Sequence, residues 1–268
     1  MVAISDAMPF AHKVALGLLN GVSGVNKFGR NIEVDAGVTA DLWDGGHTLA
    51  SGGVSLIWVP PTQARIHAIV SSDAGDDSAG LGAKTIRIYG LTDWDTKEVS
   101  EDIIMDGTTP VNTVNSYVII HRMMVLTKGA TNVNIGIIKA TAATDSTITA
   151  QIRAGQGQTQ MAILGVPSNQ TILIDDTYGS LNRAGGAATG FADKQLLVNP
   201  EPQTELLNFI SKSNLGLSIP GTSHVEDSFD PPKMFPGPCI IKVQSSSLTA
   251  NLDISGGFDG VLYDNADS

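Results

Sequence analysis

The chain has 268 residues, which is enough for one large domain or two small ones, and for a sizeable core without disulfides or a structural metal. Its 16 lysines and arginines against 27 aspartates and glutamates give a net charge of −11, which excludes binding to nucleic acid or to an anionic membrane through a general basic face. Charged residues make up only 16% of the chain, and no apolar run approaches the ~18 residues of a membrane span, so the polarity comes from serine, threonine, asparagine, glutamine and glycine.

Residues 1–30 carry the only clear helical pattern. The spacing predicts a helix from about Met8 or Pro9 to Leu19, with Phe10, Val14 and Leu18 on one face. Two roles fit this apolar face: docking on a partner or a symmetry mate, or packing across the protein's own sandwich. Residues 1–34 are therefore assigned to a short N-terminal arm, helical or extended.

Beyond the arm, apolar and polar residues alternate with a period of two, which is typical of half-buried antiparallel strands. In the first half these segments are Ala64–Ser71, Lys84–Leu91, Thr131–Ile138 and Ser146–Arg153. Tyr117–Leu126 is more continuously apolar and fits either a strand covered on both faces or a buried helix. Its β-branched start favours the strand.

The second half repeats this style after a break near residues 155–166. Further strands are expected at Thr171–Asp175, Gln195–Val198, Glu205–Ser211, Cys239–Val243 and Gly260–Tyr263. Short strands with almost no helix predict a mostly β protein, an antiparallel β-sandwich or jelly-roll in two sandwich halves. The boundaries assigned are 35–160 for the first sandwich domain and 161–268 for the second.

The search for catalytic motifs is negative. The five histidines show no metal-ligand spacing, and no nucleophile elbow is present. Gly80–Thr85 superficially resembles a phosphate loop, but it lacks a glycine directly before Lys84 and opens a strand. His67 and His121 lie within strand patterns and are expected to be structural, and Cys239 to be a small core residue. The sequence therefore predicts no catalytic residue, no cofactor and no enzyme.

One loop of the first half is rich in acidic residues. Asp73, Asp76 and Asp77 share a glycine-rich segment, and oxygen ligands on such a loop are what Ca²⁺ prefers. The spacing is not that of an EF-hand, so these residues are weak calcium candidates, and a solvated loop tip is the alternative. No other metal ligands are predicted.

Three stretches carry a resemblance to a known class of proteins. They are Val25–Gly46, Val70–Met124 and Gly237–Asn265. The middle stretch is the most specific, with a small-residue loop, the strand KTIRIYGL, an acidic turn and a DGTTPV hairpin. These stretches resemble structural proteins of tailed-bacteriophage virions. The signatures are those of turns and strands, with no catalytic motif to carry over.

The resemblance implies a β-sandwich or jelly-roll protein assembled in several copies on the virion, which forms in the host cytoplasm. The leading expectation is a capsid cement or decoration protein, a homo-oligomer such as a trimer, that staples neighbouring subunits of the major capsid protein or other virion proteins. A tail-associated or fibre protein is the second expectation. A carbohydrate-binding or depolymerising β protein is a more remote alternative. Low charge suits such subunit contacts, because it reduces the desolvation cost of burying a face.

Overall fold

The computed structural model describes residues 8–43, 55–183, 189–221 and 223–265. Strands account for 56% and helix for 2% of the structure, and the sheets are antiparallel, which confirms the predicted mostly β class. Among the described residues, no helix has the length and apolarity needed to cross a bilayer.

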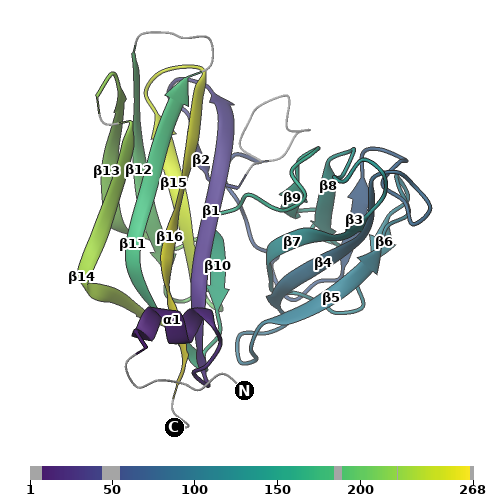
Figure 1. The fold of residues 1–268 in the computed structure, drawn as a ribbon, viewed down its shortest axis with the longest axis horizontal. Helices are drawn as coiled ribbons and strands as arrows, with labels where there is room; N and C mark the ends of the chain where they lie inside the picture. Colours follow the sequence, from purple (N-terminus) through teal and green to yellow (C-terminus); the bar gives the residue numbers. More distant parts are fainter. Residues whose placement is uncertain (1–7, 44–54, 184–188, 222, 266–268) are drawn as a thin grey trace.

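Two antiparallel sheets form an elongated β-sandwich (Figure 1). Sheet A has the strand order β1 (Val22–Val34), β16 (Leu252–Asp264), β11 (Gln170–Arg183), β14 (His224–Pro236). Sheet B has the order β10 (Ile163–Val166), β15 (Cys239–Ser247), β12 (Gly190–Asn199), β13 (Ile210–Ile219), and β2 (Thr39–Asp41) also pairs with β15. Alternate residues of both sheets face inward and pack in one apolar core that includes Ile172, Ile254, Leu196 and Val243.

A second, smaller lobe is inserted between β2 and β10 and lies beside the sandwich (Figure 1). One of its sheets has the order β6 (Val111–Asn112), β3 (His67–Ser71), β8 (Ile138–Ala142), β9 (Ile148–Ile152). The other has the order β5 (Val99–Ile104), β4 (Ala83–Leu91), β7 (Ile119–Lys128). Its core extends to the sandwich, because Trp43, Met161 and Ile240 belong to the same buried cluster as Ile86 and Ile88. The two lobes therefore share a packed boundary.

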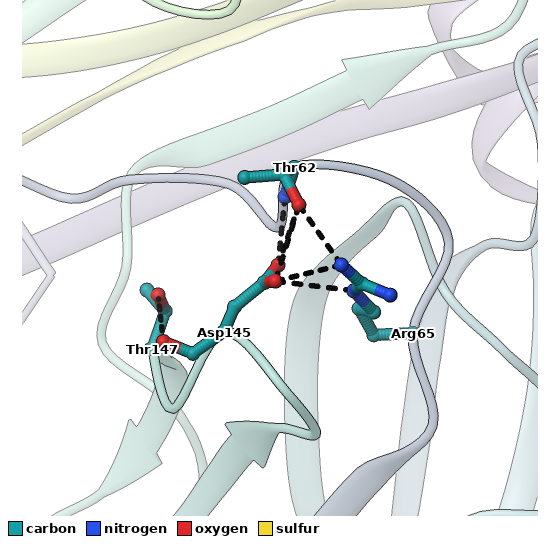
Figure 2. Close-up of polar contacts among 4 residues, drawn as sticks. All are labelled: Thr62, Arg65, Asp145 and Thr147. Carbon is teal, nitrogen blue, oxygen red and sulfur yellow. Dashed lines mark hydrogen bonds and ion pairs between the residues drawn. The ribbon is translucent and has the colours of Figure 1, made fainter.

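A polar clamp fixes the start of the inserted lobe to its β8–β9 turn (Figure 2). The Asp145 carboxylate accepts hydrogen bonds from the Thr62 amide at 2.9 Å and from two nitrogens of Arg65 at 2.9 and 3.1 Å. The Arg65 bond holds the pKa of Asp145 below its usual range. All these partners come from the lobe itself, so the clamp is structural.

The domain division expected from the sequence differs from this arrangement. Residues 22–34 are not part of an arm, because β1 pairs with β16 from Val22↔Tyr263 to Val34↔Leu252. The sandwich draws strands from both ends of the chain, and the second lobe is an insertion, so a boundary at 160/161 does not separate two sandwiches. β1 reads VSGVNKFGRNIEV, and its glycines and polar residues obscure the alternation that marks a strand.

Two local predictions are wrong. Thr131–Ile138 is a loop up to residue 137 because side chains take over its backbone hydrogen bonds. The side-chain amide of Asn134 donates to the carbonyls of Gly136 and Arg153, at 2.7 and 2.8 Å. Residues 205–209 form an irregular segment with a turn at 206–207, so only the end of Glu205–Ser211 enters β13.

Candidate docking face and inter-lobe contacts

The N-terminal helix α1 (Phe10–Ala15) lies across one end of sheet A (Figure 1). Pro9 precedes it, and the amides of His12 and Lys13 donate to the Pro9 carbonyl, which closes the first turn. The helix ends earlier than predicted because Gly17 adopts a left-handed φ of 64°. Helix α1 is therefore a short element whose position depends on the sheet beneath it.

The three predicted docking residues have different environments. Val14 is 8% exposed and packs over Gly24 of β1, where an added Cβ would lie 3.7 Å from Val14 Cγ1. Phe10 stacks on Tyr263 of β16, with ring centroids 6.5 Å apart, and remains 49% exposed. Leu18 is half-buried. Val14 thus packs on the protein's own sandwich, whereas Phe10 presents an apolar surface to the outside.

An apolar groove of about 660 Å³ runs between α1 and the outward face of sheet A. Its walls include Phe10 from the helix, Leu173 from β11, Pro232 from β14, and Val261 and Tyr263 from β16. The outward residues of these strands are only half-buried, since no further layer covers this face in the described part of the chain. The sequence predicted a strand at Gly260–Tyr263 but did not predict that α1 lies beside it.

A row of carboxylates borders the groove. Asp259 of β16 pairs in register with Asn26 of β1 and with Asp176 of β11, so all three side chains leave the same face. Asp175 and Asp259 line the groove itself. Partial burial raises the pKa of Asp176, and repulsion from neighbouring carboxylates adds a smaller effect in the same direction. The pKa reaches about 6, and the neighbours are Asp259, Glu226 and Asp175. The outward face of sheet A thus combines an apolar groove with crowded negative charge.

Asp176→Asn is expected to stabilise the protein at pH 7. A carboxyl whose pKa is raised on folding makes the folded state less stable as pH rises through that pKa, so the amide removes a penalty present above about pH 6 and absent near pH 4. Because Asp176 is partly exposed and solvent screens its neighbours, the gain is about 1 kcal/mol. Urea unfolding at pH 7 and pH 4 measures it.

Asp175→Asn is the matched control, because Asp175 is the adjacent carboxylate and is exposed. It is expected to gain less than half as much. An Asp176→Asn variant no more stable than the wild type at pH 7 would show that the carboxylates do not repel one another.

The inter-lobe boundary holds a histidine–carboxylate pair that resembles a catalytic dyad in outline only. His121 Nε2 lies 2.5 Å from Glu98 Oε2, and the Gly165 amide donates to His121 Nδ1 at 3.3 Å. With Nδ1 accepting and Nε2 donating, the ring has no free lone pair for a general base. Burial lowers the pKa of His121, and burial likewise lowers that of His67 to about 4. Both histidines are buried within strands β7 and β3, as predicted.

The acidic loop uses its carboxylates to hold the backbone. Asp73 accepts from the Gly75 amide at 2.7 Å, and Asp77 accepts from the Ala79 amide at 2.8 Å. Asp76 is fully buried and accepts four hydrogen bonds. In the described ranges no three acidic, histidine or cysteine side chains are grouped so that they could hold a metal ion. The structure therefore assigns these three aspartates to loop folding.

Cys239 is buried at the start of β15, and burial raises the pKa of its thiol to about 12. This is the environment of a core residue.

The sequence matches no protein-family model and no curated protein.

Proposed function

We propose that this chain is a non-enzymatic structural protein of a tailed-phage virion, a capsid cement protein that docks on neighbouring subunits through the outward face of sheet A. The observation that carries the proposal is the apolar groove beside α1 together with its border of carboxylates. Exposed apolar surface rimmed by polar groups is typical of protein contact sites.

The edges of sheet A favour contact through its face. Strand β14 forms one edge, and Pro231, Pro232 and Pro236 have no amide hydrogen to offer an added strand. Strand β1 forms the other edge, where Lys27 donates to the His121 carbonyl of the inserted lobe at 2.5 Å. Addition of a partner's strand is therefore disfavoured at both edges of sheet A. Contact through the outward face of this sheet is favoured instead.

The chemistry of the face selects one kind of partner. An aromatic or aliphatic side chain fits the groove beside Phe10, and lysines or arginines flanking it would meet Asp175, Asp176 and Asp259. A basic segment of a capsid subunit would relieve the repulsion among these carboxylates. In a homo-oligomer such as a trimer, several weak contacts of this kind would add through high effective concentration.

A tail-associated role is the second candidate, and the two-lobed build favours it. The inserted lobe lies beside the sandwich (Figure 1), so one lobe could anchor while the other projects towards a receptor. A copy number close to that of the major capsid protein supports the cement role, whereas a few copies per particle support the tail role.

Phe10→Ser is expected to lower occupancy on particles by at least tenfold without unfolding the protein. The side chain is half exposed, so its loss removes groove surface and little core. Occupancy is measured by adding purified protein to particles that lack it and quantifying bound copies. A melting temperature within a few degrees of wild type shows that the fold is kept.

Phe191→Ser is the matched control. Phe191 has the same residue type and a similar exposure, 47%, but lies on β12 of sheet B. It is expected to bind like the wild type. If Phe10→Ser decorates particles as well as Phe191→Ser does, the groove is not the docking site.

A further inference from the structure

A second cavity, of about 580 Å³, opens between β1 and the inserted lobe. Lys27 from β1 and Arg122 from β7 line it, as do Lys97, Glu98 and Gln158. Its chemistry differs from that of the α1 groove, because cationic and amide side chains dominate its polar walls, whereas the groove is apolar and bordered by carboxylates. In a protein with a net charge of −11, a cavity with three cations is a local reversal of charge.

Two of these cations form no ion pair at contact distance in the described part of the chain. Lys27 donates to the His121 carbonyl at 2.5 Å, and no carboxylate oxygen lies within 4.0 Å of its ammonium group. Arg122 makes one long hydrogen bond to Gln158, at 3.3 Å, and its guanidinium lies 5.5 Å from the centre of the Tyr89 ring. Lys27 is half-buried, so its bond to a carbonyl compensates its desolvation only in part, whereas Arg122 is exposed at the mouth of the cleft.

Lys97 pairs with Asp264 at 2.5 Å. Glu98 bonds to the neutral ring of His121, so its negative charge is kept and attracts both Lys27 and Arg122. Burial lowers the pKa of Lys27 to about 7, an effect that Glu98 opposes and Arg122 reinforces. Two cations, Lys27 and Arg122, thus face one carboxylate, Glu98, in the same cleft, which leaves a net positive charge that an anion would meet.

We propose that the inter-lobe cleft binds a small oxyanion, a carboxylate or a phosphate group, between Lys27 and Arg122. Arg122 supplies a planar fork of donors, and Lys27 supplies a point charge. Gln158 and Thr159 also line the cleft and offer hydrogen bonds to hydroxyl groups of the same ligand. The volume of the cleft suits a small molecule.

Calorimetric titration of the full chain with inorganic phosphate and, separately, with citrate tests the proposal. It is done at pH 6, where Lys27 is protonated, and at constant ionic strength set with sodium chloride. Saturable binding of either anion with a Kd of about 1 mM or below is expected. The tighter of the two anions identifies the ligand group as phosphate or carboxylate.

Lys27→Met and Arg122→Gln are each expected to weaken that binding at least tenfold. Lys128→Met is the matched control, because Lys128 is an exposed lysine at the end of β7, outside the cleft, and it is expected to bind like the wild type. No saturable binding of either anion overturns the proposal. So does binding that Lys27→Met and Arg122→Gln, both folded by circular dichroism, retain at wild-type strength.

Discussion

Replacing Asp76 by alanine is expected to destabilise the inserted lobe by about 4 kcal/mol, a large part of the total stability of a typical domain. The buried carboxylate accepts from the Ser71 hydroxyl at 2.6 Å. It also accepts, each at 2.8 Å, from the amides of Ala83, Ile135 and Gly136. Three of these donors are backbone amides, and a buried donor left without an acceptor costs about 1–3 kcal/mol.

Urea unfolding followed by circular dichroism measures this loss. Asp76→Asn is expected to lose about half as much, because its amide keeps one acceptor oxygen but turns a donor towards backbone amides. Asp77→Asn is the matched control, since asparagine can still accept from the Ala79 amide, and it is expected to change stability by less than about 0.5 kcal/mol. An Asp76→Ala variant as stable as the wild type would contradict the role of this carboxylate.

Lys242→Met is expected to cost about 3–5 kcal/mol because it leaves a buried carboxylate without its cation. The Lys242 ammonium lies 2.7 Å from Asp41 Oδ2, and both side chains are almost fully buried. Asp41 also accepts from the Trp58 amide at 2.8 Å and from Gln244 at 2.9 Å. This ion pair therefore joins β2 and β15 of the sandwich to the start of the inserted lobe.

The loss in Lys242→Met is expected to grow as pH rises. Burial raises the pKa of Asp41, and Lys242 opposes that shift. Without the lysine the folded state favours the protonated acid more strongly, so stability is lost as pH rises through the folded-state pKa. Unfolding measured at pH 5 and pH 8 detects this difference.

The double variant Asp41→Asn with Lys242→Met is the test of coupling. It removes both charges while the asparagine oxygen still accepts a hydrogen bond, so it is expected to recover at least half of the loss. If the double variant is less stable than Lys242→Met, the two side chains do not act as an ion pair.

The sequence predicted the strands whose side chains alternate locally. In β4, Ile86 and Ile88 are buried, and Arg87 and Tyr89 between them are half-buried, as the pattern KTIRIYGL indicates. Strand β3 shows the limit of this reasoning, because its fully buried residues are His67, Ile69 and Ser71. Each of the two polar residues has a hydrogen-bond partner there: the Ser71 hydroxyl donates to Asp76, and His67 Nδ1 bonds to the Arg65 carbonyl.

The contacts that the sequence did not predict join residues that are far apart along the chain. The acidic loop was interpreted as a weak calcium candidate because the sequence cannot show that residues near Ile135 supply amides to Asp76. The outward face of sheet A was only partly predicted. Phe10, Val14 and Leu18 were named from helical spacing, but Tyr263 and Asp176 come together on this face because β16 and β11 are neighbours in sheet A. Pairing between distant strands is set by packing, which local patterns do not report.

A reconstruction of the intact virion tests the central proposal most directly, because it shows which surface of each copy is buried. The proposal predicts many copies on the head, each with the α1 groove and the carboxylates around Asp176 covered by a basic segment of a capsid subunit. Copies whose sheet A faces solvent while another surface makes every contact would contradict it, as would particles that lack the protein altogether.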